Sequence, residues 1–203
     1  MVDGGPRGRL PDPGILPADL ALRLEGVHDE LADPGGLRLA AVIGLLLEGP
    51  RRIDDPALLL IERSSQLRQH AGQIAFPGGK PEPDDRDLLD TALREAWEEV
   101  GLPRDEVRIL GRLSPVPTPS GYMIVPFVGR VISDWEPERT SPEVARILTP
   151  SVRTLLDPGV HRHAGEVEWR GVTYDLHEFA IAEPPLWGAT ARMVWDLLER
   201  IRG

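Results

Sequence analysis

Three glutamates, Glu95, Glu98 and Glu99, stand within one short stretch of a segment that is predicted to be helical. At about 100° per residue, all three side chains fall on one arc of such a helix. Like charges at spacings of three and four residues repel each other by roughly a few tenths of a kcal/mol per pair. A helix face that meets only solvent more often alternates Glu with Lys or Arg. The cluster therefore has two interpretations, a solvated surface or a site for a cation.

Two neighbouring features favour the cation site. Arg94 precedes Glu98 by one helical turn, where it can pair with the carboxylate and fix its rotamer. Gly78 and Gly79 precede the helix, and residues without a side chain let backbone carbonyl groups approach a site closely. Several carboxylates plus a carbonyl oxygen make a hard-oxygen ligand set, which suits Mg²⁺ or Mn²⁺.

The segment GGKPEPDDRDLLDTALREAWEEVGL resembles the Nudix box, written G-x(5)-E-x(7)-R-E-U-x-E-E-x-G-U with U aliphatic. Residues 94–102 meet every fixed position of its second half, with Ala96 as a small apolar residue at the first U. The first half departs from the pattern, because the stretch between Gly79 and Arg94 is one residue longer. Asp85 is then the nearest acidic residue to the expected Glu. The coenzyme A subgroup of the family tolerates such an extra residue.

A second segment, LLLIERSSQLRQHAGQIAFPGG, resembles the stretch before the box in coenzyme A pyrophosphatases. The matching residues are Arg63, Ser64, Leu67, Arg68, His70, Gly72, Gln73, Phe76, Pro77, Gly78 and Gly79. The later segments TPSGYMIVPFVG and LWGATARMVWDLL are also similar to these enzymes. The resemblance covers roughly residues 38–200, which is nearly the whole chain.

The resemblance implies an α/β fold, a Nudix α/β/α sandwich around a mixed sheet. It implies metal-dependent hydrolysis of the diphosphate of coenzyme A or its thioesters, with 3′,5′-ADP and 4′-phosphopantetheine or its acyl form as products. The implied ligands of Mg²⁺ or Mn²⁺ are Glu95, Glu98 and Glu99, with the carbonyl of Gly79. One glutamate of this set, supported by Arg94, is expected to act on water as a general base. Glu143, in the loop SPEV, is a second candidate base, and its alternative role is an acid at a helix start.

Seven residues are expected to bind the substrate: Arg63, Arg68, His70, Gln73, Phe76, Ser120 and Tyr122. An arginine fork suits phosphate oxygens. For Arg63 and Arg68 the alternative is an ordinary surface charge, and for Tyr122 it is a place in the core. Two other functions stay open: a Nudix hydrolase of another nucleoside derivative such as ADP-ribose, or a non-catalytic Nudix-fold metabolite sensor.

The predicted elements must position these residues. Strands are predicted at 37–48, 57–64 and 73–79, as a pair within 106–132 and as a hairpin over 166–181, and helices at 17–31, 85–100, within 141–157 and over 186–201. Hairpins that interleave with helices favour a mixed sheet flanked by helices over a doubly wound parallel sheet. His161 and His163 fall in a predicted loop, where no metal site is expected, and Trp187 and Trp195 are expected in the core.

The composition limits the classes of function. With 203 residues, the chain predicts an N-terminal extension over 1–36 and one Nudix domain over 37–203. A net charge of -10 argues against a nucleic-acid binder but not against an anionic substrate that meets a metal ion. The absence of cysteine excludes disulfides and thiolate chemistry. No signal peptide or membrane span is predicted, so we expect a cytoplasmic protein that contacts a small-molecule substrate and no membrane.

Overall fold

The structure is a computed structural model, and it describes residues 16–28, 31, 33–49, 52, 55–67 and 69–203. Its main elements, in chain order, are η1 (Leu20–Arg23), β1 (Arg38–Leu47), β2 (Ala57–Arg63), β3 (Ile74–Ala75), β4 (Gly78–Gly79), α1 (Leu88–Val100), η3 (Arg104–Glu106), β5 (Val107–Arg112), β6 (Val116–Pro117), β7 (Tyr122–Val131), β8 (Val144–Leu148), α2 (Val152–Leu156), β9 (His161–Trp169), β10 (Val172–Phe179) and α3 (Gly188–Arg202).

A mixed sheet forms the centre of the molecule, with the strand order β3-β2-β1-β7-β5. β1 runs parallel to β7 along its whole length and antiparallel to β2, where Leu45 pairs with Leu59. Successive side chains of a strand point to opposite faces. Leu45 accordingly joins the core under α1, and Leu46 joins the core under α3. The apolar run of β1 is therefore buried on both faces, and the predicted mixed α/β sheet is confirmed.

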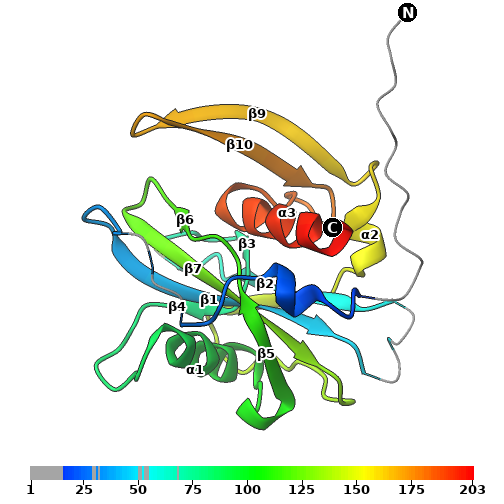
Figure 1. The fold of residues 1–203 in the computed structure, drawn as a ribbon. Helices are drawn as coiled ribbons and strands as arrows, with labels where there is room; N and C mark the ends of the chain where they lie inside the picture. Colours follow the sequence, from blue (N-terminus) through cyan, green and yellow to red (C-terminus); the bar gives the residue numbers. More distant parts are fainter. Residues whose placement is uncertain (1–15, 29–30, 32, 50–51, 53–54, 68) are drawn as a thin grey trace, which may run out of the picture.

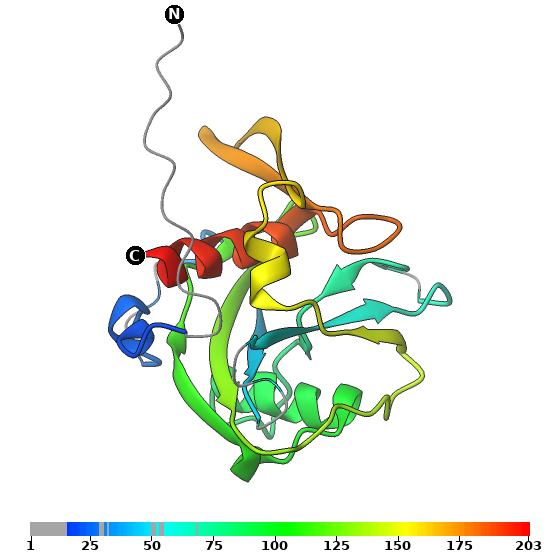
Figure 2. The same cartoon turned by 90° about the vertical axis from the view of Figure 1, so that its right-hand side faces the viewer.

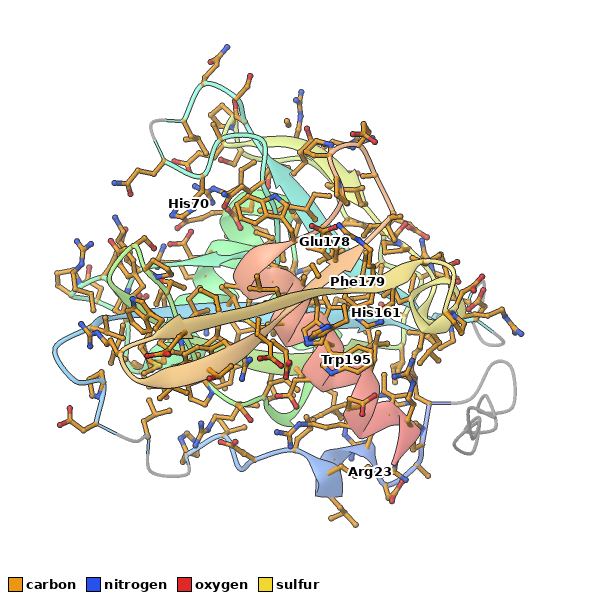
Figure 3. The ribbon with its side chains drawn as sticks, turned by 90° about the horizontal axis from the view of Figure 1, so that it is seen from above. Arg23, His70, His161, Glu178, Phe179 and Trp195 are labelled. Atoms are coloured by element: carbon orange, nitrogen blue, oxygen red, sulfur yellow. The ribbon has the colours of Figure 1, made fainter. Side chains whose placement is uncertain are left out.

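Helices cover both faces of this sheet. α1 packs on one face, and α3 with α2 lies on the other (Figures 1 and 2). The β9–β10 hairpin forms a separate two-stranded sheet that lies over α3 (Figure 1). In Figure 3, His161 and Trp195 lie together between this hairpin and α3. The ring of Trp195 stacks on His161 with 4.2 Å between centroids and on His177 with 4.8 Å. No helix among the described residues is long and apolar enough to span a membrane.

The sequence of α1 explains both of its ends. Asp87 caps the N-terminus, where its side chain accepts a hydrogen bond from the Asp90 amide, and Gly101 ends the helix at φ 71. The predicted start at residue 85 is three residues too early, since α1 begins at Leu88. The carboxylate of Asp85 instead accepts a hydrogen bond from the Glu82 amide and closes the turn before the cap. The apolar stripe of α1 is buried, as predicted, against β1.

The predicted N-terminal helix over 17–31 is mostly wrong. Among the residues of this segment that the structure describes, only η1 is helical, and Asp19 makes no side-chain cap there. The chain then extends, because Glu25 pairs with Arg112 of β5 through backbone hydrogen bonds. Leu20 is buried, whereas Leu22 is 86% exposed.

The predicted helix within 141–157 is wrong in its first part. Residues Val144–Leu148 form β8, which pairs with the free edge of β2. The β-branched residues Val144 and Ile147 favour a strand. Only α2 is helical, capped by the Ser151 side chain, which accepts a hydrogen bond from the Thr154 amide. The region 106–132 likewise holds a third short strand, β6, in addition to the predicted two.

Three further expectations concern aromatic side chains. His161 and His163 lie on strand β9 instead of in a loop. Trp187 is 50% exposed and is not a core residue. Trp195 packs against the core under the hairpin, as expected. The predicted hairpin over 166–181 is confirmed, but β9 begins five residues earlier, at His161.

Candidate active site

The acidic arc of α1 faces the short strand β4. A β-carbon on Gly79 would lie 2.2 Å from Glu95 Oε1, so the carboxylate of Glu95 rests directly against the Gly79 backbone. The amide of Gly78 donates a hydrogen bond of 3.0 Å to Glu99 Oε2. Gly78 has φ 152, and a side chain there would collide with β1, because its β-carbon would lie 2.3 Å from the Ala41 carbonyl oxygen. The glycine pair thus lets two carboxylates approach the backbone.

Burial separates the three glutamates electrostatically. Glu99 is 4% exposed, and burial raises its pKa to about 8. Burial also raises the pKa of Glu95. Each of these two carboxylates repels the other's negative charge, which adds to the rise for Glu99. Glu98 is different, because its side chain is 51% exposed. A buried and a partly buried carboxylate that repel each other are what a bound cation would stabilise.

Arg94 is the centre of the polar network beside these carboxylates. Its Nη1 lies 3.2 Å from Glu95 Oε1 and 3.3 Å from Glu98 Oε2. Its Nη2 donates to the Lys80 carbonyl oxygen over 3.1 Å. One guanidinium group therefore touches two glutamates of the predicted site and the backbone that follows β4.

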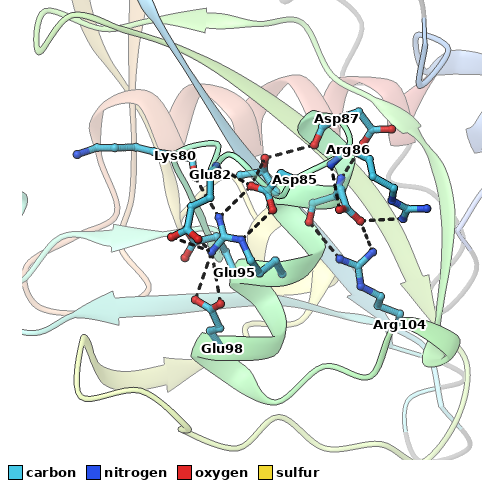
Figure 4. Close-up of polar contacts among 11 residues, drawn as sticks. Lys80, Glu82, Asp85, Arg86, Asp87, Glu95, Glu98 and Arg104 are labelled. Atoms are coloured by element: carbon cyan, nitrogen blue, oxygen red, sulfur yellow. Dashed lines mark hydrogen bonds and ion pairs between the residues drawn. The ribbon is translucent and has the colours of Figure 1, made fainter.

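Asp85 holds Arg94 in place. Its Oδ1 accepts a hydrogen bond of 2.9 Å from Arg94 Nε, and its Oδ2 accepts one of 3.1 Å from Nη2. Thr91 Oγ1 donates a further bond of 2.9 Å to Asp85. Hydrogen bonding by Arg94 lowers the pKa of Asp85 to about 2. The extra residue before the helix thus leaves Asp85 within reach of the site, as the partner of Arg94 (Figure 4).

Arg63, at the end of β2, and Glu143, just before β8, lie in the same region. Arg63 Nη1 lies 3.8 Å from Glu99 Oε1, and its Nη2 lies 3.5 Å from Glu143 Oε2. Glu143 precedes β8 in a turn, so its alternative role at a helix start is wrong. The structure therefore brings Glu143 into the neighbourhood of Glu99 through one arginine.

The predicted substrate residues fall into different environments. His70 Nδ1 lies 2.8 Å from Gln73 Oε1 in the exposed β2–β3 connection, and Arg68 lies outside the described residues. Phe76 is 1% exposed, and its ring is enclosed by the core against Gly44. Ser120 Oγ is 3.0 Å from Thr118 Oγ1 in the loop before β7.

Tyr122, by contrast, is 8% exposed and lies beneath two cations. The Arg38 guanidinium is 4.2 Å from the centre of its ring, and the Lys80 ammonium is 5.6 Å from it. Sequence reasoning missed both cations. The position of Lys80 directly after the glycine pair was a signal for it. Nothing in the local sequence marks Arg38, because only the parallel pairing of β1 with β7 brings it to Tyr122.

Asp90, for which the sequence suggested no role, is buried beside Arg86 and Arg104. These two arginines hold the pKa of its carboxyl well below the ordinary range of aspartate. Asp90 lies on the first turn of α1, away from the three glutamates. Its network stabilises the helix start and contributes no ligand to the site.

The donor set fits a hard divalent cation. The carboxylates of Glu95 and Glu99 lie against the glycine pair of β4, and Glu98 lies beside Arg94. Oxygen donors of this kind, with the Gly79 backbone carbonyl, are what Mg²⁺ and Mn²⁺ prefer. Within the described part of the chain, no three acidic or histidine side chains already converge as a finished metal site. Glu98 faces Arg94, and Glu99 faces the Gly78 amide. Binding an ion there requires these carboxylates to reorient.

Comparison with known proteins gives the family. A family model described as NUDIX domain matches residues 37–187. A Photorhabdus laumondii protein named "Uncharacterized Nudix hydrolase NudL" is 35% identical over 165 residues, which cover 81% of this chain and 86% of that protein. A Yersinia pestis protein of the same name is 37% identical over 147 residues, covering 72% and 73%. The chain belongs to the Nudix hydrolase family. A solved Nudix hydrolase from M. smegmatis, RenU, aligns with 61% of this chain and 79% of its own at 21% identity and a TM-score of 0.48.

Proposed function

We propose that this protein hydrolyses the diphosphate of coenzyme A or its thioesters with the help of a divalent metal ion. The observation that carries the hydrolytic part is the packing of two carboxylates, the partly buried Glu95 and the buried Glu99, against the glycine pair of β4. The choice of coenzyme A rests on the resemblance of residues 58–79 to the segment found before the Nudix box in coenzyme A pyrophosphatases. The extra residue before α1 supports the same choice, because Asp85 still reaches Arg94.

The exposure of each carboxylate determines the role that we assign to it. Glu95 and Glu99, which lie against β4, are suited to hold the ion together with the Gly79 carbonyl. A divalent ion supplies charge stabilisation for the phosphate oxygens and lowers the pKa of a bound water. Glu98 is exposed and touches Arg94, so it is the member best able to accept a proton from that water. Glu143 is the second candidate for this proton transfer, through its place beside Arg63.

The balance of the reaction is simple. The oxygen of water forms a bond to one phosphorus of the diphosphate, and the bridging P–O bond breaks. The proton removed from water passes first to the carboxylate and then to solvent. We assign the nucleotide part of the substrate to Arg63, which contacts Glu99, and to His70 and Gln73, which contact each other in the β2–β3 connection. The products are 3′,5′-ADP and 4′-phosphopantetheine or its acyl form.

The test is incubation of the purified chain with coenzyme A, acetyl-coenzyme A and ADP-ribose, each with Mg²⁺, with Mn²⁺ and with EDTA. Products are identified by mass spectrometry. We expect cleavage of the coenzyme A compounds with metal and none with EDTA. Glu98→Gln should reduce kcat about a hundredfold or more, whereas Glu168→Gln on the exposed face of β9 should not change it. Much faster turnover of ADP-ribose than of coenzyme A would contradict the choice of substrate.

A further inference from the structure

Arg38 and Lys80 share one aromatic ring although they come from distant parts of the chain. Arg38 is the first residue of β1, Tyr122 is the first residue of β7, and the two are partners in the parallel register. Lys80 follows β4 directly. Both cations lie within the distance at which an ammonium or guanidinium group is attracted by an aromatic face. Parallel pairing of two central strands and the turn after β4 therefore fix two positive charges on one buried ring.

Among the described residues, neither of these two cations has a carboxylate partner. Other arginines near the site are paired, as Arg63 is with Glu143 and Arg94 is with Asp85. In the part of the chain that the structure describes, the side chains of Arg38 and Lys80 contact the Tyr122 ring, and no carboxylate pairs with either side chain. The whole chain carries a net charge of -10, so carboxylates are abundant. Two cations on one ring that no described carboxylate neutralises mark a place suited to an external anion in an acidic protein.

The pair lies next to the proposed metal site. Lys80 follows Gly79, whose backbone touches the Glu95 carboxylate. The carbonyl oxygen of Lys80 accepts a hydrogen bond from Arg94. In Figure 4 the Lys80 side chain extends away from the Arg94 network, so its charge is not used there. An anion held by Lys80 and Arg38 would thus sit beside the scissile diphosphate and not on it.

We infer that Arg38 and Lys80 form an anion-binding subsite that holds a phosphate of the substrate outside the scissile diphosphate. A guanidinium that stacks through its face keeps its N–H edge free for phosphate oxygens. Tyr122 is buried and gives both side chains a rigid support. This assignment rests on the proposed function: the group held is the 3′-phosphomonoester of coenzyme A. This subsite would let the enzyme distinguish coenzyme A from its 3′-dephospho form.

The test compares kcat/KM for coenzyme A and 3′-dephospho-coenzyme A in the wild type, Arg38→Gln and Lys80→Gln. The wild type should prefer coenzyme A, and each variant should reduce this preference about three- to tenfold through KM, as expected for an exposed charge-assisted contact. Rising salt should reduce the wild-type preference in the same way. Arg38→Lys keeps the charge and should retain part of the preference. Arg108→Gln, which removes an exposed arginine of β5, is the matched control and should leave it unchanged.

Two outcomes would overturn the subsite while leaving the proposed function intact. One is a wild type that cleaves both compounds equally well. The other is a variant that lowers kcat/KM for both compounds by the same factor, together with a lower melting temperature, since this would show that the cations only support Tyr122.

If the wild type cleaves neither compound, the proposed function fails and binding decides the subsite separately. The affinities of 3′,5′-ADP and 5′-AMP are then measured by calorimetry with Mg²⁺ present. A preference for 3′,5′-ADP that Arg38→Gln removes would support the subsite. Equal affinities, or a preference that survives in Arg38→Gln and in Lys80→Gln, would overturn it.

Discussion

The carboxylate of Glu95 occupies the space that a side chain at Gly79 would need, with 2.2 Å between Oε1 and the position of a β-carbon there. Gly79→Ala should therefore push Glu95 out of its place. We expect kcat/KM to fall roughly a hundredfold, because a shift of about 1 Å in a reacting group has that effect. The fold should survive, since the displaced atoms end a flexible side chain. Gly159→Ala, whose β-carbon would meet Asp157 Oδ1 at 3.3 Å, is the control. Full activity in Gly79→Ala would show that Glu95 is not needed where it lies.

Asp85 and Asp90 offer a matched pair of substitutions. Asp85→Asn weakens the hold on Arg94 and should lower kcat about tenfold or more, together with a loss of about 1–3 kcal/mol of unfolding free energy. Asp90→Asn removes the charge that Arg86 and Arg104 share and should cost about 1–3 kcal/mol of unfolding free energy. Its effect on kcat should be small. Both quantities are measured on both variants by urea unfolding and steady-state kinetics. If kcat falls no more in Asp85→Asn than in Asp90→Asn, Asp85 has only a structural role.

The pKa of Glu99 predicts how stability responds to pH. Burial raises this pKa to about 8, whereas the unfolded chain releases the same proton near 4.5. The folded state thus binds more protons between these values, and without metal its stability must fall as pH rises through this window. At pH 8.5 the metal-free wild type should have a lower melting temperature than Glu99→Gln, and at pH 5.5 the two melting temperatures should be similar. Mg²⁺ should raise the wild-type melting temperature more at pH 8.5, because it binds the deprotonated carboxylate. Identical pH dependence in both proteins would contradict the assignment.

The histidines under the β9–β10 hairpin predict the opposite pH dependence, a loss of stability as pH falls. His161 Nε2 lies 3.0 Å from His177 Nδ1, and burial lowers the pKa of both below the ordinary 6.5. Arg202 opposes protonation of His161 and Arg192 opposes that of His177, while Glu199 and Asp175 favour it. The unfolded chain then binds more protons just below pH 6.5, so stability is lost as pH falls through this range.

His177→Gln tests this prediction, with His28→Gln at an exposed histidine as the control. Urea unfolding between pH 5 and 7 should show a shallower loss of stability in His177→Gln than in the wild type. His28→Gln should follow the wild type. If the His177→Gln slope equals that of the wild type, the pair does not contribute to acid sensitivity.

The sequence predicted the mixed sheet and α1 well, because both depend on local patterns. The buried run of β1 and the stripe of α1 leave few alternatives. The strand β8 escaped prediction, since Val144 to Leu148 becomes a strand only by pairing with the edge of β2. The helix predicted over 17–31 failed for a similar reason, because Glu25 is drawn into backbone pairing with Arg112.

For the site, residue types and spacing located the glutamates and Arg94, and the contact of Arg94 with Glu98 was predicted from one helical turn. The unequal burial of Glu98 and Glu99 could not be read from spacing, because it depends on how closely β4 approaches the helix. The contact of Arg38 with Tyr122 could not be predicted for a similar reason. The two residues are distant in the chain and become neighbours only through the pairing of β1 with β7.

The contact between Arg23 and the last turn of α3 has a consequence for biosynthesis. Arg23 donates to the carbonyl oxygen of Arg200 over 3.0 Å, and Leu20, beside it, is 2% exposed. A ribosome makes Leu20 long before α3, so the nascent chain carries this leucine uncovered until nearly the whole domain has emerged. β1 must likewise wait for β7. Contacts so distant in the chain slow folding and prolong the time in which chaperones can bind. A nascent chain that ends before α3 therefore leaves Leu20 and Arg23 without the contacts that this helix provides.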